Sequence, residues 1–166
     1  IYLPGTLKRV GEYYALTKHD WITGDCLTID HIGNKIKNNW VFSLYKRFLM
    51  RIYSPIILRI ADSMLPQPST FWSRKAYQKI GDFDTSYHYA LDYDYWLRMA
   101  KYYKPHDLRI PLSGFRFHQD SKSQTGRVKL MAEGMVALRK SGAKHWELFI
   151  HARHSDLTLL IYKLLK

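Results

Sequence analysis

Apolar side chains recur at two different spacings along this chain, and the two spacings alternate. A helical period of three to four residues predicts helices over residues 4–18, 40–61, 73–79, 92–103, 127–139 and 146–165. Apolar runs bounded by turn residues predict strands over residues 21–29 and 110–118, and a tight turn at residues 32–35 follows the first. The pattern therefore predicts an α/β fold in which helices cover a small sheet.

Prolines interrupt this pattern at two places. Pro55 lies inside the apolar stretch 40–61 and should kink or split it, because proline lacks a backbone donor and clashes with the preceding turn. A loop is expected over residues 64–71, where Pro66 and Pro68 favour an extended backbone that holds Gln67 in place. The 166 residues contain no internal repeat and no clear linker, so a single-domain length is indicated.

Composition and charge narrow the class of protein. With 46% hydrophobic and 24% charged residues the chain is globular, and its net charge of +12 attracts polyanions such as nucleic acid, anionic lipid or nucleoside diphosphates. A basic, soluble surface with no such partner is the plain alternative. Zinc-finger spacing, an aromatic RNA-binding strand and a dense basic arm are all missing from the sequence, so no nucleic-acid partner is predicted. The single Cys26 is typical of a reducing compartment, and we expect a cytoplasmic location.

Asp92 and Asp94 form an acidic pair at the start of a predicted helix. Positions i and i+2 lie about 200° apart around a helix, so the two carboxylates cannot hold one ion between them. A carboxylate in the first turn is stabilised by ~0.3–1 kcal/mol, which favours a helix cap at Asp92. The alternative is a general base, which requires the carboxylate to point into a cleft within reach of a hydroxyl.

Arg116 and His118 are two positions apart on a predicted strand and therefore face the same side. An Arg fork beside a titratable His suits a diphosphate, whereas a surface Arg next to a structural His is the plain interpretation. His118 is also a candidate metal ligand, although one histidine does not make a metal site. His151 and His154 are one helical turn apart and are interpreted as surface residues.

Three motifs occur in a particular order: Gln67-Pro68-Ser69-Thr70-Phe71-Trp72, then Leu91-Asp92-Tyr93-Asp94-Tyr95-Trp96-Leu97-Arg98, then Arg116-Phe117-His118. In this order they resemble the second half of family 2 glycosyltransferases, which use nucleotide sugars. The resemblance covers residues 1–125 and implies part of a GT-A fold, with a mixed sheet and flanking helices. Residues 126–166 match no motif of the family and are expected to form a C-terminal helical extension.

The resemblance also implies roles for individual residues. Asp92 would be the catalytic base, acting alone because Leu91 occupies the place where the family often has a second acid. Gln67 and Trp72 would contact the acceptor sugar, and Asp94 is included among the substrate-binding candidates. The leaving diphosphate would be held by the pair at the strand end, Arg116 and His118. Asp25 matches a recurring family strand, where a structural hydrogen bond is favoured.

The N-terminus departs from the family pattern. The family's nucleotide-binding βαβ region and its acidic metal cluster precede a segment that resembles residues 1–5, so this chain is expected to begin just after them. The Mg²⁺ or Mn²⁺ ligands would then lie upstream of Ile1, and the 166 residues alone would be inactive. The intact enzyme would transfer a sugar, with inversion, to a carbohydrate or lipid-linked acceptor in polysaccharide, glycolipid or cell-envelope synthesis.

Two apolar stretches also suggest contact with a membrane. Residues 40–61 combine an apolar face with Lys46, Arg47, Arg51 and Arg59, and the C-terminal stretch carries Leu157, Leu160, Ile161 and Leu164. Peripheral docking on an anionic leaflet, at the inner face of the plasma membrane, is one interpretation, and packing against protein is the other. The competing function is a non-catalytic basic module that binds anionic membrane or nucleic acid. A metal-dependent phosphoesterase is disfavoured, because the sequence has no cluster of His and Asp ligands.

Overall fold

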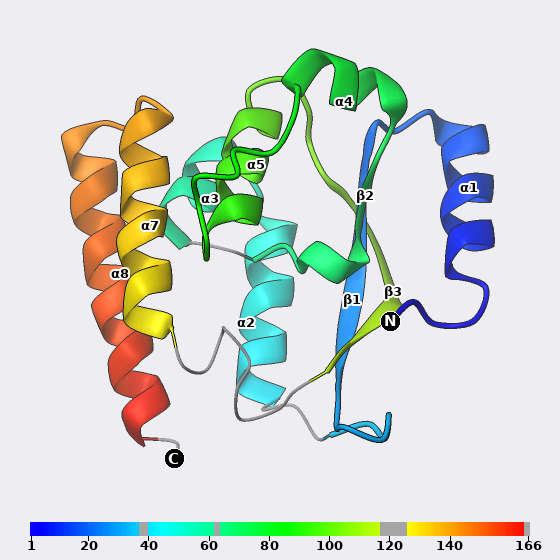
Figure 1. The fold of residues 1–166 in the computed structure, drawn as a ribbon, viewed down its shortest axis with the longest axis horizontal. Helices are drawn as coiled ribbons and strands as arrows, with labels where there is room; N and C mark the ends of the chain where they lie inside the picture. Colours follow the sequence, from blue (N-terminus) through cyan, green and yellow to red (C-terminus); the bar gives the residue numbers. More distant parts are fainter. Residues whose placement is uncertain (37–39, 62–63, 117–125, 165–166) are drawn as a thin grey trace.

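The centre of the molecule is a three-stranded mixed sheet in the strand order β2-β1-β3. A computed structural model describes residues 1–36, 40–61, 64–116 and 126–164. The strands are β1 (Trp21–Ile29), β2 (Thr70–Trp72) and β3 (His106–Arg116), and helices flank them (Figure 1). β1 pairs antiparallel with β2 and parallel with β3. The predicted α/β class, with a mixed sheet and flanking helices, is therefore confirmed.

Strand bounds agree with the sequence pattern for β1 and differ for the other two strands. β2 was not predicted, and its first two residues, Thr70 and Phe71, fall at the end of the loop expected over residues 64–71. β3 begins at His106, four residues earlier than expected, because a bulge interrupts its pairing with β1 between Thr23 and Cys26. Arg109 adopts a left-handed φ of 56° at this bulge. Gly24 is needed opposite, since a Cβ there would lie 2.7 Å from the Ile110 carbonyl oxygen.

Seven α-helices occupy the described residues: α1 (Thr6–Thr17), α2 (Trp40–Arg51), α3 (Pro55–Ala61), α4 (Arg74–Ile80), α5 (Leu91–Met99), α7 (Arg127–Lys140) and α8 (His145–Leu164). Pro55 splits the long apolar stretch as predicted, and α3 begins at that residue. The expectation of an extended backbone around Pro66 and Pro68 was wrong for Gln67–Ser69. These residues form a short 3₁₀ turn, η1, closed by a bond from the Ser69 N–H to the Pro66 carbonyl.

Helices lie on both faces of the sheet (Figure 1). Consecutive residues of β1 point to opposite faces, so Ile22 meets Val10 of α1 on one side while Trp21 meets α5 on the other. The helix predicted over residues 92–103 is shorter in the structure, and the helix predicted over residues 127–139 packs mainly on other helices. The first ends at Met99, and α7 has its main contacts with α5 and α8 rather than with the sheet.

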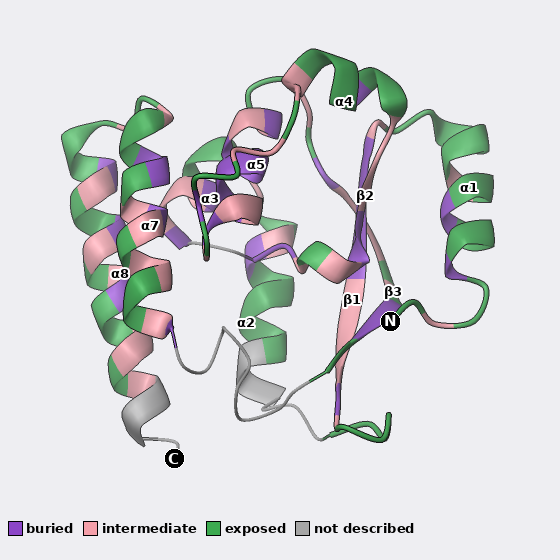
Figure 2. Ribbon diagram, viewed as in Figure 1, coloured by how far each residue is buried: buried purple, intermediate pink, exposed green. Residues whose placement is uncertain are grey.

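The main core is built around α5, whose buried positions Figure 2 shows in purple. Trp96 is fully buried, and its ring centroid lies 5.6 Å from those of both Trp21 and Trp72. Ala137 and Leu138 of α7 belong to the same cluster of buried residues. The helical extension expected over residues 126–166 therefore shares its core with the preceding part of the chain.

His151 was interpreted as a surface residue, and this was wrong: its exposed fraction is 1%. Its Nδ1 lies 2.8 Å from the Arg59 carbonyl oxygen, and its ring stacks on Tyr93 with the centroids 5.9 Å apart. The Tyr93 hydroxyl donates to the carbonyls of Leu58 and Arg59. The last carbonyls of a helix have no partner within the helix, so α5 and α8 together cap the C-terminus of α3.

Candidate functional site

Asp92 lies in the first turn of α5, at the end of the loop formed by residues 81–90. The side chain is half-buried, and its Oδ1 accepts a hydrogen bond of 2.8 Å from the N–H of Tyr93. The unpaired N–H groups at the start of a helix favour a negative charge there. Asp92 is therefore anchored by the first turn of the helix while part of its surface faces solvent.

The backbone entering α5 is capped from a distance by Glu133 of α7. Its Oε2 accepts hydrogen bonds of 2.6 Å from the N–H of Tyr89 and 3.0 Å from the N–H of Ala90, which has no side chain able to cap. Burial alone would raise the pKa of Glu133, but these bonds and one from the N–H of His88 outweigh it and lower the pKa. Glu133 thus binds the backbone just before α5, while Asp92 accepts the N–H of Tyr93 inside the first turn, as expected for a capping carboxylate.

Two further contacts from α7 hold the same loop. Lys140 Nζ lies 2.6 Å from Asp84 Oδ2, and the pKa of Asp84 is lowered by this bond and by bonds from Ser86. Gly126 packs on the ring of Tyr89 so closely that a Cβ there would lie 2.1 Å from a ring carbon. Since Glu133 binds this loop too, α7 fixes the backbone that leads to Asp92.

Asp94 has a structural environment. The residue is buried, and its Oδ2 accepts a bond of 2.9 Å from Arg98 Nε one turn later. Arg98 also donates to the carbonyls of Ile80 and Asp82. The pair therefore joins α5 to the turn after α4, and the buried carboxylate offers a substrate almost no accessible surface.

The two acceptor-side candidates differ in environment. Gln67 is exposed in η1. Trp72 is half-buried among aromatic rings, with its centroid 5.2 Å from Tyr95 and 5.8 Å from Phe83. These contacts, with Trp96 as a third neighbour, give Trp72 a packing role in the core and leave little of its ring for a sugar.

Arg116 is the last residue of β3, and it is exposed. Its guanidinium donates to the carbonyl of His31. His118 lies outside the described residues. A short connection joins the C-terminus of α5 to the N-terminus of β3, so the start of α5 and the end of β3 are directed towards the same side of the molecule (Figure 1). Asp25 pairs with Arg47 at 3.0 Å, which is the structural contact that the sequence favoured.

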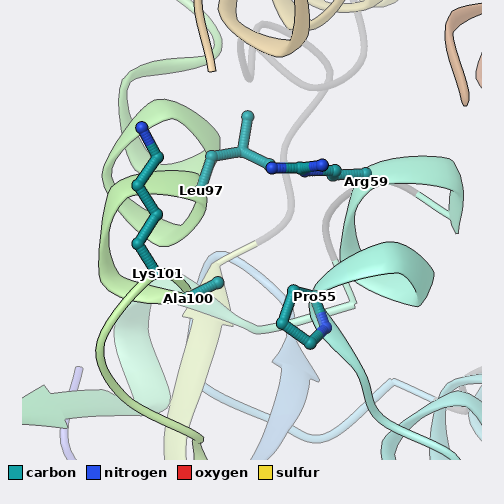
Figure 3. Close-up of a pocket in the computed structure, with 5 residues that line it drawn as sticks. All are labelled: Pro55, Arg59, Leu97, Ala100 and Lys101. Atoms are coloured by element: carbon teal, nitrogen blue, oxygen red, sulfur yellow. The ribbon is translucent and has the colours of Figure 1, made fainter. Parts of the chain in front are cut away.

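A cavity of about 230 Å³ lies between α3 and the C-terminal half of α5, away from the first turn that holds Asp92 (Figure 3). Arg59, which reaches into it from α3, is already bonded to Glu147 at 3.1 Å. None of the catalytic or substrate-binding candidates from the sequence lines this cavity. It is lined by Pro55, Arg59, Leu97, Ala100 and Lys101.

Metal ligands are not grouped in the part of the chain that the structure describes: it has no set of three or more His, Cys, Asp or Glu side chains placed to hold an ion. These residues therefore do not form a centre for the Mg²⁺ or Mn²⁺ that the resemblance implies. Comparison with known proteins adds no relative, since no family model and no curated protein matches this chain.

Glu133 and Lys140 are the site residues that sequence reasoning missed. Each is a single charged residue on a helix with no family motif, and the atoms they bind are 44 and 56 residues away along the chain. The helical period around them predicts α7 but gives no indication of a partner in the loop before α5. Only the tertiary arrangement reveals this contact.

Proposed function

We propose that this chain forms the acceptor-side portion of an inverting glycosyltransferase of the GT-A type. The donor would be a nucleotide sugar, and the acceptor a hydroxyl of a carbohydrate or lipid-linked molecule in polysaccharide or glycolipid synthesis. The observation that carries the proposal is the placement of Asp92. It lies half-buried in the first turn of a core helix, after a loop that α7 holds through Glu133, and only one of its carboxylate oxygens accepts the bond from the Tyr93 N–H.

In this mechanism the Asp92 carboxylate accepts the proton of the acceptor hydroxyl while the hydroxyl oxygen attacks the anomeric carbon. The sugar–phosphate bond breaks on the opposite side, which inverts the configuration at that carbon. Arg116, together with His118, would place positive charge beside the diphosphate as it leaves. Gln67, exposed next to β2, is retained as an acceptor contact, whereas Asp94 and Trp72 serve the fold.

A divalent cation would offset the charge of the departing diphosphate in the intact enzyme. We assign none of its ligands to this chain and expect them upstream of Ile1. Reading the gene upstream of Ile1 gives a first test. An acidic pair there, preceded by a βαβ pattern, supports the proposal, and its absence contradicts it.

The decisive experiment uses the protein expressed from the whole gene. Release of nucleoside diphosphate is measured over a panel of nucleotide sugars and acceptors. Asp92→Asn should lower kcat by ~10²–10⁴-fold and leave donor binding largely intact, because the amide keeps the shape of the side chain but cannot take the proton. Arg116→Ala should weaken donor binding as well as turnover.

Asp156→Asn is the matched control, because Asp156 is an exposed carboxylate on α8 that pairs only with a neighbour on the same helix. It should leave turnover unchanged. Full activity of Asp92→Asn would contradict the assignment of the base. Failure of every nucleotide sugar to react or bind would favour the non-catalytic alternative instead.

A further inference from the structure

The side chains that α8 buries most deeply are polar, and most of those on its outer side are apolar. Its buried side carries Glu147, His151 and Ser155, which recur every four residues and therefore share one face. Glu147 binds Arg59 and the N–H of Lys144, and His151 binds the Arg59 carbonyl. The polar face is thus held against α3 by specific bonds, and Leu148 of the same helix packs against the main core.

The outer side of α8 is apolar and exposed. Because each residue advances about 100° around a helix, the five side chains on this side fall within an arc of about 100°. Phe149 is 66% exposed and Leu157 is 55% exposed. We call this set the α8 stripe: Trp146, Phe149, Ile150, Leu157 and Leu160. Arg153 lies within the same arc, with its guanidinium carbon 5.8 Å from the centroid of the Phe149 ring, so the face is mainly rather than wholly apolar. An exposed apolar face on a helix surface marks a site of interaction.

A second exposed apolar row lies beside it on α2. The Tyr45 hydroxyl is 2.8 Å from His154 Nε2, so the two helices are neighbours at this point. Leu44, Phe48 and Ile52 are exposed and spaced four residues apart, and they form what we call the α2 row. Figure 2 shows exposed positions along both helices. The row and the stripe flank the contact between Tyr45 and His154.

Charge decides which occupant fits this surface. Basic residues accompany both apolar rows: Lys46 and Arg51 on α2 and Lys144 just before α8, together with Arg47 and Arg153, which pair with Asp25 and Asp156. The acids of α8 are already engaged, since Glu147 is buried against Arg59 and Asp156 pairs with Arg153. Two copies of a chain with net charge +12 would repel each other when these faces met, whereas an anionic lipid surface would attract them.

We propose that α8 and α2 lie together in the interface of an anionic lipid bilayer, with the α8 stripe and the α2 row in contact with the acyl boundary. Within the described residues no helix is both long and apolar enough to cross a membrane. An exposed apolar face flanked by basic residues suits docking parallel to the surface. The basic residues would bind the lipid phosphates at the rim. This inference does not rest on the proposed transferase, because it concerns a different surface and its test uses no nucleotide sugar.

Vesicle flotation of the 166-residue chain tests the proposal. The chain should bind vesicles of phosphatidylcholine with phosphatidylglycerol and bind vesicles of phosphatidylcholine alone much less, and added salt should release it. Phe149→Ser and Leu157→Ser should each lower the partition coefficient by about tenfold, since each removes one large apolar side chain from the lipid. Circular dichroism should be unchanged in both variants, because the altered side chains are exposed.

Matched controls lie on the opposite part of the molecule. Leu16→Ser removes an exposed leucine from α1, and Arg74→Glu reverses an exposed charge on α4. Neither should alter vesicle binding, whereas Arg51→Glu should weaken it. Equal loss for Leu16→Ser and Leu157→Ser would overturn the assignment of the surface.

The oligomeric state of the chain without lipid distinguishes a lipid surface from the competing occupant, which is a second copy of the chain. Sedimentation velocity should give a monomer for the unaltered chain. A dimer that dissociates on Phe149→Ser, together with absent vesicle binding, would overturn the proposal and identify a second copy of the chain as the occupant. Equal binding to neutral and anionic vesicles would also overturn it, because the basic rim would then contribute nothing.

Discussion

Two helices that pack on α3 bury opposite kinds of side chain. α5 buries Tyr93, Tyr95 and Trp96 together with the apolar residues of its last turns, whereas α8 buries Glu147, His151 and Ser155. Both helices nevertheless meet at the same point, because Tyr93 and His151 bond to the same carbonyl of Arg59. Apolar periodicity therefore locates a helix more reliably than it identifies the buried face.

The polar character of the buried face of α8 is explained by α3, the helix on which it packs. α3 has only seven residues, so a large share of its backbone carbonyls are terminal ones without a bond inside the helix. A neighbour that supplies donors stabilises this end, and an apolar neighbour would leave the carbonyls unpaired at a cost of about 1–3 kcal/mol each. α8 supplies one such donor, His151, and its polar side therefore faces α3 while most of its large apolar residues are exposed.

The largest expected effect is on the α5 side of the comparison. Trp96→Ala should lower the free energy of unfolding by about 3–5 kcal/mol, because it removes a fully buried ring in contact with Trp21 and Trp72. Urea denaturation followed by circular dichroism measures the change. Trp146→Ala, on the α8 stripe, is the control and should cost less than about 0.5 kcal/mol. Similar losses for the two tryptophans would contradict the contrast between the helices.

A somewhat smaller effect is expected on the buried face of α8. Glu147→Ala should cost about 3 kcal/mol, because it removes a carboxylate that is 2% exposed and leaves Arg59 without its partner. Asp156→Ala breaks an exposed pair on the same helix and should cost less than about 1 kcal/mol. If urea denaturation gives the same midpoint for both variants, the polar face of α8 is not a structural element.

The smallest expected loss of stability concerns Glu133, which binds the backbone just before α5. Glu133→Gln should cost about 1 kcal/mol at neutral pH, because the amide oxygen can still accept the two N–H bonds but lacks the charge that strengthens them. The folded-state pKa of Glu133 is lowered from 4.5, so its contribution is fully present above that value and is lost as pH falls through the folded pKa.

The stability of the two proteins should therefore converge on acidification. Thermal unfolding at a series of pH values between neutral and strongly acidic measures this convergence. If the difference in thermal stability between the unaltered chain and the Glu133→Gln variant stays constant over the whole pH series, the assigned role of Glu133 is contradicted.

Much of the fold could be predicted from local pattern. β1 was predicted with its correct bounds, because a polar residue precedes the apolar run and a turn follows it. The break at Pro55 followed from the chemistry of proline. β2 was missed because a three-residue strand is too short to show alternation, and its pairing with β1 depends on residues about fifty positions away.

Only part of the candidate site could be predicted from the sequence. The position of Asp92 at a helix start followed from the apolar period of α5, and the pairing of Asp94 with Arg98 could have been inferred from their spacing of four residues. The burial of His151 could not, since its partners lie on α3 and α5. Long-range contacts of this kind leave no local trace in the chain.

The bond between Glu133 and the backbone before α5 has a consequence for the order of folding. During synthesis Tyr89 and Ala90 emerge from the ribosome more than forty residues before Glu133 does, so the start of α5 is made before the side chain that binds it. Until α7 has been made and has docked, the first turn of α5 can fray and Asp92 has no fixed orientation. Any activity that depends on Asp92 is therefore delayed until the chain has been translated beyond α7.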